Sequence, residues 1–179
     1  MEIGRVVENY RFAGFANPLL DKDSAIYVEM ADFYNPTGTD VYPEGSPYGA
    51  GSPKPKALLI NVSAVWCGPC NYENDQVLPV EYAKYAPRGA QFFLQLADGP
   101  TVGTPAKFSH LVNWTTKYDT AWPAVIDPSS KLSELFEANA FPANIIIDTK
   151  TMTIVDVIAG APEAGSPFFT NLESLIDPE

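Results

Sequence analysis

Cysteine, histidine and basic residues are all scarce in this chain of 179 residues. It contains two cysteines and one histidine, and its 11 Lys and Arg residues stand against 22 Asp and Glu residues, which leaves a formal net charge of -11 at pH 7. Such a charge repels nucleic acid and anionic lipid, so we expect no nucleic-acid partner. A structural zinc site usually takes four ligands, and the chain offers only the cysteine pair and the distant His110. We therefore expect no metal.

Long apolar runs are also missing. No stretch approaches the roughly 20 apolar residues of a membrane-spanning helix, and the start, Met1-Glu2-Ile3-Gly4-Arg5, lacks the apolar core of a signal peptide. The mature part of an exported protein would begin in the same way, so localisation has to be argued from other features. Membrane association is expected only if the full-length form carries a lipid anchor.

Proline and glycine divide the chain. Residues 1–34 contain short apolar stretches at 10–12 and 25–28, which predict strands or a hairpin beside a main sheet. Residues 35–56 are rich in Pro and Gly, which predicts a long loop. We expect residues 1–56 to form an N-terminal extension and a Pro/Gly-rich loop that pack on the same domain as a core of residues 57–179.

The pattern from residue 57 onward predicts an α/β fold. Apolar runs at 57–63 and 91–96 are typical of strands buried on both faces. Helical patterns follow each run, at 70–85 and at about 105–118, and Pro79 should kink the first helix. Strands that alternate with helices in this way pair in parallel.

The last third predicts further strands and helices. Residues 124–127 favour a short strand, and Ser129 or Ser130 would cap a helix that carries Leu132, Leu135 and Phe136. Residues 143–148 and 153–158, joined by a turn at 149–151, predict an antiparallel hairpin that closes the sheet. A last helix is expected at 168–176.

The two cysteines lie in the motif Trp66-Cys67-Gly68-Pro69-Cys70, between a predicted buried strand and a helix. A pair this close constrains the unfolded chain little, so reactivity explains it better than a pair of structural cysteines. At a helix N-terminus, backbone N–H groups stabilise a Cys67 thiolate, which predicts Cys67 as a reachable attacking residue. Cys70, one turn further in and less exposed, would resolve the mixed disulfide. Gly68-Pro69 permits the tight turn that starts the helix.

This motif and the order of elements resemble the thioredoxin superfamily, and within it the extracytoplasmic TlpA/ResA-like (redoxin) branch of thiol-disulfide oxidoreductases. The resemblance runs from about residue 57 to 176, roughly two thirds of the chain. It implies a thioredoxin-like fold, with a central mixed sheet flanked by helices, an N-terminal β extension, and an insertion at 123–139 before a cis-proline. It implies no cofactor other than a redox-active Cys67–Cys70 disulfide.

The resemblance also assigns supporting residues. Asn61 stands six residues before Cys67, where thioredoxins proper have a buried Asp and this branch commonly has Asn. Glu73 matches the frequent active-site Glu of the branch, which implies proton handling, whereas a helical Glu is otherwise mostly solvated. Pro142 matches the cis-proline, and Phe141 would then offer its backbone to an extended peptide.

For other residues near the motif, the sequence allows more than one role. Trp66 would either cover the disulfide or simply pack, and His110 is expected to be a surface or packing residue rather than a base. Asp75 departs from the family pattern, because many members have a helix-kinking Pro at that position. An acid there would oppose thiolate formation at Cys67 if it pointed toward the sulfur.

We therefore predict an enzyme that reduces protein or small-molecule disulfides, by Cys67 attack and Cys70 resolution, with an upstream electron donor. One alternative is a non-enzymatic redox sensor or binding module in which the N-terminal third makes the contacts. A thiol peroxidase is another, but Ser63-Ala64-Val65-Trp66 does not supply the Pro and the Thr or Ser expected before a peroxidatic cysteine. Cysteine pairs of this kind fit either side of a membrane, and the branch resemblance implies the bacterial periplasm or cell envelope.

Overall fold

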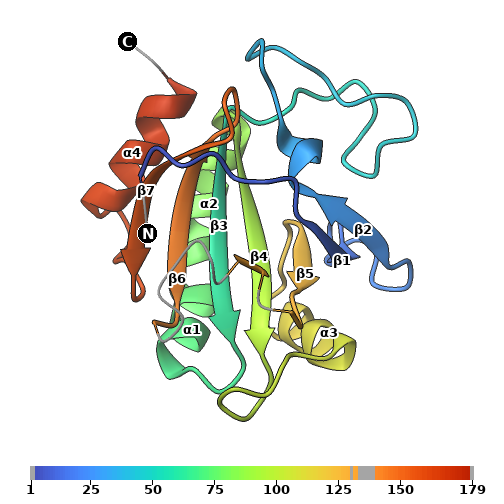
Figure 1. Cartoon of the computed structure of the whole chain (residues 1–179), viewed down its shortest axis with the longest axis vertical. Helices are drawn as coiled ribbons and strands as arrows, with labels where there is room; N and C mark the ends of the chain where they lie inside the picture. Colours follow the sequence, from blue (N-terminus) through green and yellow to red (C-terminus); the bar gives the residue numbers. More distant parts are fainter. Residues whose placement is uncertain (1–2, 130, 133–139, 178–179) are drawn as a thin grey trace.

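A seven-stranded mixed sheet, in the order β2-β1-β5-β4-β3-β6-β7, forms the centre of the computed structural model, which describes residues 3–129, 131–132 and 140–177 (Figure 1). The strands are β1 (Arg11–Phe15), β2 (Ile26–Glu29), β3 (Ala57–Ala64), β4 (Ala90–Asp98), β5 (Ala124–Ile126), β6 (Ala143–Asp148) and β7 (Thr153–Ala159). The helical elements are η1 (Met30–Phe33), α1 (Gly68–Tyr72), η2 (Glu73–Val77), α2 (Leu78–Tyr85), η3 (Ala86–Arg88), α3 (Phe108–Lys117) and α4 (Pro167–Ile176).

Strands β3, β4 and β5 pair in parallel, as the alternation of strands and helices predicts. The N-terminal hairpin of β1 and β2 is confirmed, and β1 extends the sheet by pairing antiparallel with β5. The predicted hairpin of β6 and β7 is confirmed as well. The helix expected after Ser129 falls mostly outside the described residues, as does much of the 123–139 insertion.

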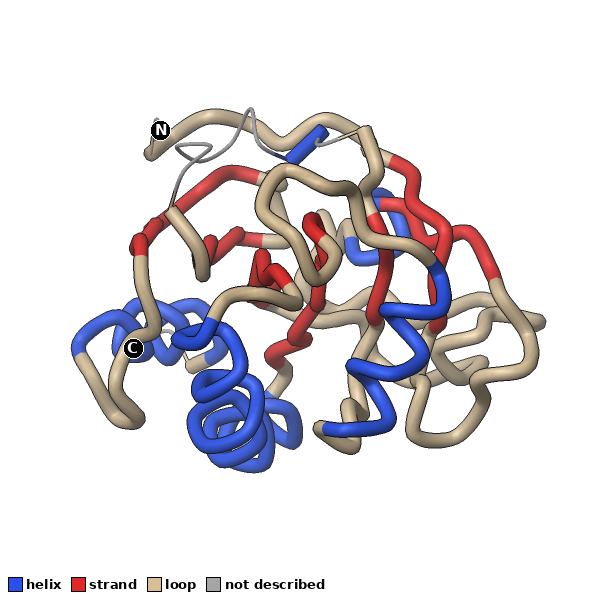
Figure 2. Tube along the Cα trace, turned by 90° about the horizontal axis from the view of Figure 1, so that it is seen from below, coloured by secondary structure: helices blue, strands red, loops and turns tan. Residues whose placement is uncertain are grey.

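The sheet separates two apolar clusters. All eight residues of β3 are buried, because this strand lies between β4 and β6 and is covered on both faces. Figure 2 shows helices α1 to α4 on one side of the strands and the N-terminal segment crossing the other side. Alternate side chains of each strand face opposite sides, so Leu59 and Phe92 join the helix-side cluster, while Leu58 and Phe93 join the other one.

The N-terminal third bonds to the rest of the sheet at two places: β1 pairs with β5, and residues near the start of the chain bond to β7. Near its start, the N–H of Gly4 donates to the carbonyl of Ile154 at 2.8 Å, and Ile154 returns a bond of 2.8 Å to Arg5. Residues 35–56 form the predicted loop, whose only extended pairing among the described residues is an isolated bridge. The buried Asn35 amide donates to the carbonyls of Lys54 and Pro55 at 3.2 and 3.0 Å and so ties the two ends of this loop together.

Residues 68–85 form one continuous helical segment that changes its winding. It begins as α1, widens into the π-helical turn η2, and continues as α2. The N–H of Leu78 reaches back to the carbonyl of Glu73 across this turn. This wide turn ends two residues before Pro79, and it is the helix irregularity that the sequence predicts near that proline. In the part of the chain that the structure describes, no helix is long and apolar enough to cross a membrane.

Candidate active site

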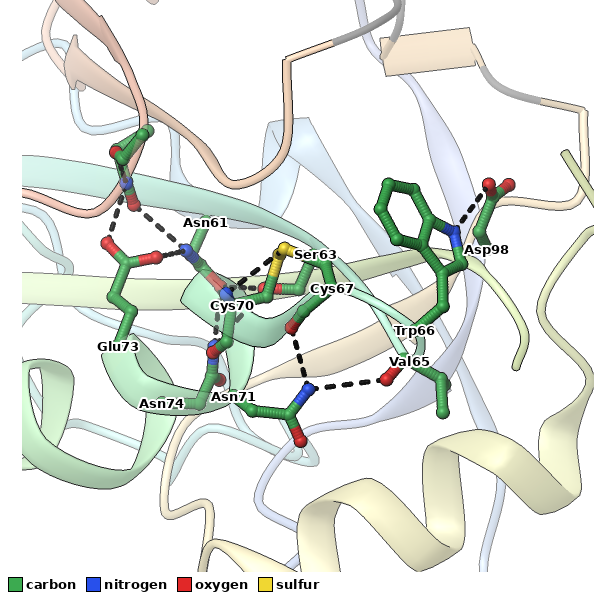
Figure 3. Close-up of a disulfide and its surroundings, with 12 residues drawn as sticks. Asn61, Ser63, Val65, Trp66, Cys67, Cys70, Asn71, Glu73, Asn74 and Asp98 are labelled. Atoms are coloured by element: carbon green, nitrogen blue, oxygen red, sulfur yellow. Dashed lines mark hydrogen bonds between the residues drawn. A yellow bond between two sulfur atoms is a disulfide. The ribbon is translucent and has the colours of Figure 1, made fainter. Parts of the chain in front are cut away.

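The two cysteines form a disulfide at the carboxyl end of β3, where α1 begins (Figure 3). Their Cα atoms are 5.2 Å apart. Cys67 is the N-cap of α1, with extended backbone, and its sulfur accepts the N–H of Cys70 at 3.1 Å. Gly68 and Pro69 occupy the first two helical positions, and Pro69 has no N–H to satisfy there. A Cys67 thiolate would therefore accept the N–H of Cys70 at the start of this helix.

Cys67 is more buried than the sequence predicts. Its exposed fraction is 2% in this disulfide form, against 0% for Cys70, so the expected order holds but neither residue is open to solvent. Its polar backbone atoms are engaged, since its N–H donates to Ala64 and its carbonyl accepts the Asn71 side chain at 2.7 Å. Its sulfur faces Cys70.

A network of buried polar side chains lies beside the disulfide. Asn61 and Ser63 are two residues apart on β3 and so point to the same side, toward α1 and η2. The Ser63 hydroxyl donates to the Asn61 side-chain oxygen at 2.8 Å, and the Asn74 amide donates to that same oxygen at 3.2 Å and to Ser63 at 3.1 Å. Asn74 also donates to the carbonyl of Cys70 at 3.0 Å, which connects the network to the redox pair.

Glu73 supplies the carboxylate of this network. Its exposed fraction is 0%, which contradicts the solvated interpretation of a helical Glu. One carboxylate oxygen accepts from Asn61 at 2.8 Å and the other from Asn144 at 2.7 Å. Burial raises the pKa of Glu73 to about 8, and the two amide donors oppose this shift without cancelling it. Glu73 thus titrates near neutral pH, three residues after Cys70.

Several members of the network were not predicted. Asn144 lies on β6 directly opposite Asn61, and its exposed fraction is 0%. Asn74 is equally buried and accepts the indole N–H of Trp114 at 3.3 Å. A single polar residue inside the apolar strand 143–147 was the signal for Asn144. No comparable signal marks Asn74, because the wide turn η2 determines which residues of the helix face inward.

The peptide bond between Phe141 and Pro142 is cis, as the family resemblance implies. Phe141 packs edge to face against Trp66, with ring centroids 5.7 Å apart. The Trp66 indole donates to Asp98 at 3.1 Å, and the same carboxylate oxygen accepts the N–H of Gly103 at 2.8 Å. Asp98 therefore fixes both Trp66 and the loop after β4 beside the disulfide, a role that the sequence did not reveal.

Asp75 and His110 each form a hydrogen bond with a residue close to them in sequence. Asp75 is exposed and accepts the side-chain amide of its neighbour Gln76 at 2.7 Å. His110 accepts the backbone N–H of Lys107 through Nδ1 at 3.1 Å, at the start of α3. Among the residues that the structure describes, no group of three or more His, Cys, Asp or Glu side chains is placed to hold a metal ion. The chemistry available here is that of the disulfide and the Glu73 carboxyl group.

The chain is similar to a curated protein over part of its length. The thiol-disulfide oxidoreductase ResA of Bacillus cereus is 26% identical over 107 residues, which cover 60% of this chain and 57% of ResA. The match therefore spans little more than half the length of that relative. No protein-family model matches the chain.

Solved structures match nearly the whole chain. A thiol:disulfide interchange protein DsbE from Chlorobium tepidum, whose assignment is provisional, superposes with a TM-score of 0.68 at 16% identity, covering 99% of both chains. The chain has the thioredoxin fold and is similar to ResA. An exposed lipoprotein thioredoxin from Streptococcus pneumoniae gives a TM-score of 0.61 at 20% identity over 93% of this chain and 99% of that one. The α/β fold with a mixed sheet and flanking helices is thereby confirmed.

Proposed function

We propose that the protein is a thiol-disulfide oxidoreductase that reduces disulfides in other proteins. The observation that carries this proposal is the Cys67–Cys70 disulfide at the start of a helix, with the N–H of Cys70 directed at the Cys67 sulfur. The similarity to ResA supports the same reaction class. An N–H donor at the helix start favours the thiolate of Cys67 over its thiol, so Cys67 is the attacking residue.

The reaction consists of two exchanges. In the reduced protein the Cys67 thiolate attacks a substrate disulfide, which forms a mixed disulfide and releases one substrate thiolate that takes up a proton. Cys70 then loses its proton and attacks the Cys67 sulfur, which releases the second substrate thiol and forms the Cys67–Cys70 disulfide. Two electrons pass from the protein to the substrate, and an upstream dithiol donor returns them.

Glu73 is suited to the proton transfer of the second exchange. Its pKa is raised to about 8 by burial, so this carboxyl group can take up and release a proton near neutral pH. We propose that the Glu73 carboxylate, which accepts from the amides of Asn61 and Asn144, takes up the Cys70 proton and becomes the neutral acid. The cis peptide of Pro142 and the Phe141 backbone would bind the substrate segment as an extended strand.

Reduction of insulin tests the proposal. The reduced full chain should cleave insulin disulfides with turnover in the presence of dithiothreitol, and Cys67→Ser should abolish this turnover. Cys70→Ser should instead accumulate a mixed disulfide with insulin through Cys67, because the resolving thiol is missing. No turnover by the native chain, together with normal partner binding by Cys67→Ser, would favour a binding module. If the chain oxidises a reduced protein faster than it reduces insulin, the proposed direction of electron flow is wrong.

We also propose that the protein works outside the cytoplasm, in the bacterial periplasm or cell envelope. The support is the likeness to the pneumococcal thioredoxin that is described as an exposed lipoprotein. Fractionation of the cells that make the protein tests this localisation, and recovery from the cytoplasm alone contradicts it.

A further inference from the structure

A small cavity with a mainly apolar lining lies between α1 and α3. Its volume is about 170 Å³, below the roughly 300–1,000 Å³ of small-molecule sites, so it fits one side chain of a bound protein better than a free ligand. Asn71 lines it and donates to the Cys67 carbonyl at 2.7 Å and to the Val65 carbonyl at 3.2 Å. In Figure 3, the Asn71 side chain extends from α1 toward a neighbouring helix. One side chain thus separates the cavity from the attacking cysteine.

The ionisable side chains that line this cavity include no acid. Lys117 donates to the Asn71 oxygen at 2.9 Å, its ammonium nitrogen lies 4.7 Å from the centroid of the Tyr118 ring, and within the described part of the chain it forms no salt bridge. His110 accepts the Lys107 N–H through Nδ1, so the neutral ring carries its proton on Nε2 and can donate from there. The exposed Asn113 adds an amide that no side-chain hydrogen bond of the described residues engages. These three groups are donors suited to a carboxylate.

The other side of Lys117 is different. A second cavity of about 230 Å³ is lined by Lys117, Asn71 and Tyr118 together with Asp75. An incoming carboxylate would meet the exposed Asp75 there, whereas no acidic residue lines the first cavity. Charge complementarity therefore selects the cavity that contains Asn113 and His110.

We propose that this cavity receives an Asp or Glu side chain of the substrate protein, close to the substrate's reactive cysteine, and that Lys117 and Asn113 select such substrates. The inference rests on the proposed reductase function, because it assigns a substrate feature to that same site. The carboxylate accepts from the Lys117 ammonium and the Asn113 amide while the Cys67 sulfur attacks.

Three synthetic peptides test this specificity. Each is closed by one internal disulfide and differs only in carrying Glu, Gln or Lys at one position, which is scanned along the residues next to a cysteine. The readout is the second-order rate constant for oxidation of the reduced full chain, followed by chromatography of the peptide products. At the best position we expect the Glu peptide to react about threefold to fivefold faster than the Gln peptide, and the Lys peptide to be the slowest. Added salt should reduce the difference.

Variants assign the preference to the cavity. Lys117→Gln should bring the Glu-to-Gln rate ratio close to one, Lys117→Glu should make the Lys peptide the fastest, and Asn113→Ala should lower the ratio in part. Lys22→Gln is the matched control, because Lys22 is a half-buried lysine that also contacts α3, through Thr116 at 3.0 Å, but does not line the cavity. Its ratio should equal that of the native chain.

The outcomes separate this inference from the proposed function. Reduction of all three peptides at equal rates, at every position, overturns the specificity site and leaves the reductase intact. A Glu preference that survives in both Lys117→Gln and Asn113→Ala overturns it as well. Failure of the native chain to reduce the neutral Gln peptide overturns the proposed function, and the specificity site with it.

Discussion

The two faces of β3 are equally buried but differ in composition. Ile60 and Val62 point away from the helices into a cluster of aliphatic and aromatic side chains. Asn61 and Ser63 alternate with them and point toward the helices, where they meet Glu73 and Asn74. One strand thus supports an apolar core on one side and, on the other side, a hydrogen-bonded polar network that follows the apolar Ala57 and Leu59. The comparison separates the residues that stabilise this fold from those that prepare its chemistry.

On the polar face, the buried side chains form hydrogen bonds with one another. Burying polar groups costs free energy unless they are paired, and here the amides of Asn61 and Asn144 both donate to the Glu73 carboxylate. No cation among the described residues forms a salt bridge with Glu73, so desolvation dominates and its pKa is raised to about 8. The stability contributed by this face must depend on pH, whereas that of the apolar face should not.

The largest expected effect is on the apolar face. Phe33, in η1, is fully buried and packs against Phe93 and Tyr48, with ring centroids 6.0 and 5.4 Å apart. Phe33→Ala should lower the free energy of unfolding by about 3–5 kcal/mol, because it leaves a cavity. We propose that residues 1–56 fold as one unit with the core, so denaturant unfolding monitored by fluorescence and circular dichroism should show a single shifted transition.

That same variant should leave the chemistry unchanged. The rate at which iodoacetamide alkylates Cys67 in the reduced, folded protein should match that of the native chain, since Phe33 lies on the face of the sheet away from the helices. Two separate transitions would show that the N-terminal extension unfolds on its own. An altered alkylation rate would show that the two faces are coupled.

Glu73→Gln should remove the pH dependence of the polar face. The pKa of Glu73 is raised from 4.5 to about 8 in the folded chain, so its neutral form adds stability that is fully present below the lower value. This contribution is lost as the pH rises through about 8, and its size is on the order of 4 kcal/mol. The native disulfide form should therefore lose stability over this range, measured by urea unfolding, and the Gln variant should lose much less.

The control for this measurement is Phe33→Leu, which changes the apolar face alone. Its loss of stability relative to the native chain should be the same at both ends of the pH range. If the native chain and Glu73→Gln instead show parallel pH profiles, Glu73 does not titrate in this window, and its assignment to proton transfer is wrong.

The strand and helix pattern carried enough information to predict most of the fold. The buried run of β3, the alternation through α3 and the β6–β7 hairpin follow from apolar periodicity, which depends on local sequence. The N-terminal strands were predicted, but their antiparallel pairing with β5 was not, because a contact between residues so far apart in the chain leaves no local pattern. The cis state of Pro142 followed from the family resemblance rather than from its neighbours.

The candidate site was less predictable than the fold. The cysteine motif was visible because its spacing is itself the signal, but the partners of Glu73 depend on tertiary placement. Asn144 faces Asn61 only because β6 pairs antiparallel with β3 in one particular register. Asn71 and Lys117 meet across 46 positions of sequence. Such juxtapositions need the fold, since nothing in the two segments points from one to the other.

The smallest expected effect concerns the link between β6 and Glu73. Asn144→Ala removes the donor to one Glu73 oxygen and the acceptor of an Asn61 N–H bond of 3.0 Å, and should cost about 1–3 kcal/mol of stability. The lost donor supported the ionised carboxylate, so the variant raises the pKa of Glu73 further. The cost should therefore be larger at about pH 9 than at about pH 6 when urea unfolding of the disulfide form is compared.

Asn35→Ala provides the matched comparison for Asn144→Ala. Asn35 is also fully buried, and its side chain bonds backbone groups only, donating to Lys54 and Pro55 and accepting from the Asp40 N–H at 3.0 Å. Its removal should cost a similar free energy that is the same at both pH values, because no carboxylate depends on it. Equal pH dependence in the two variants would mean that Asn144 contributes through packing alone. The raised pKa of Glu73 would then result from burial and would not depend on the hydrogen bond from β6.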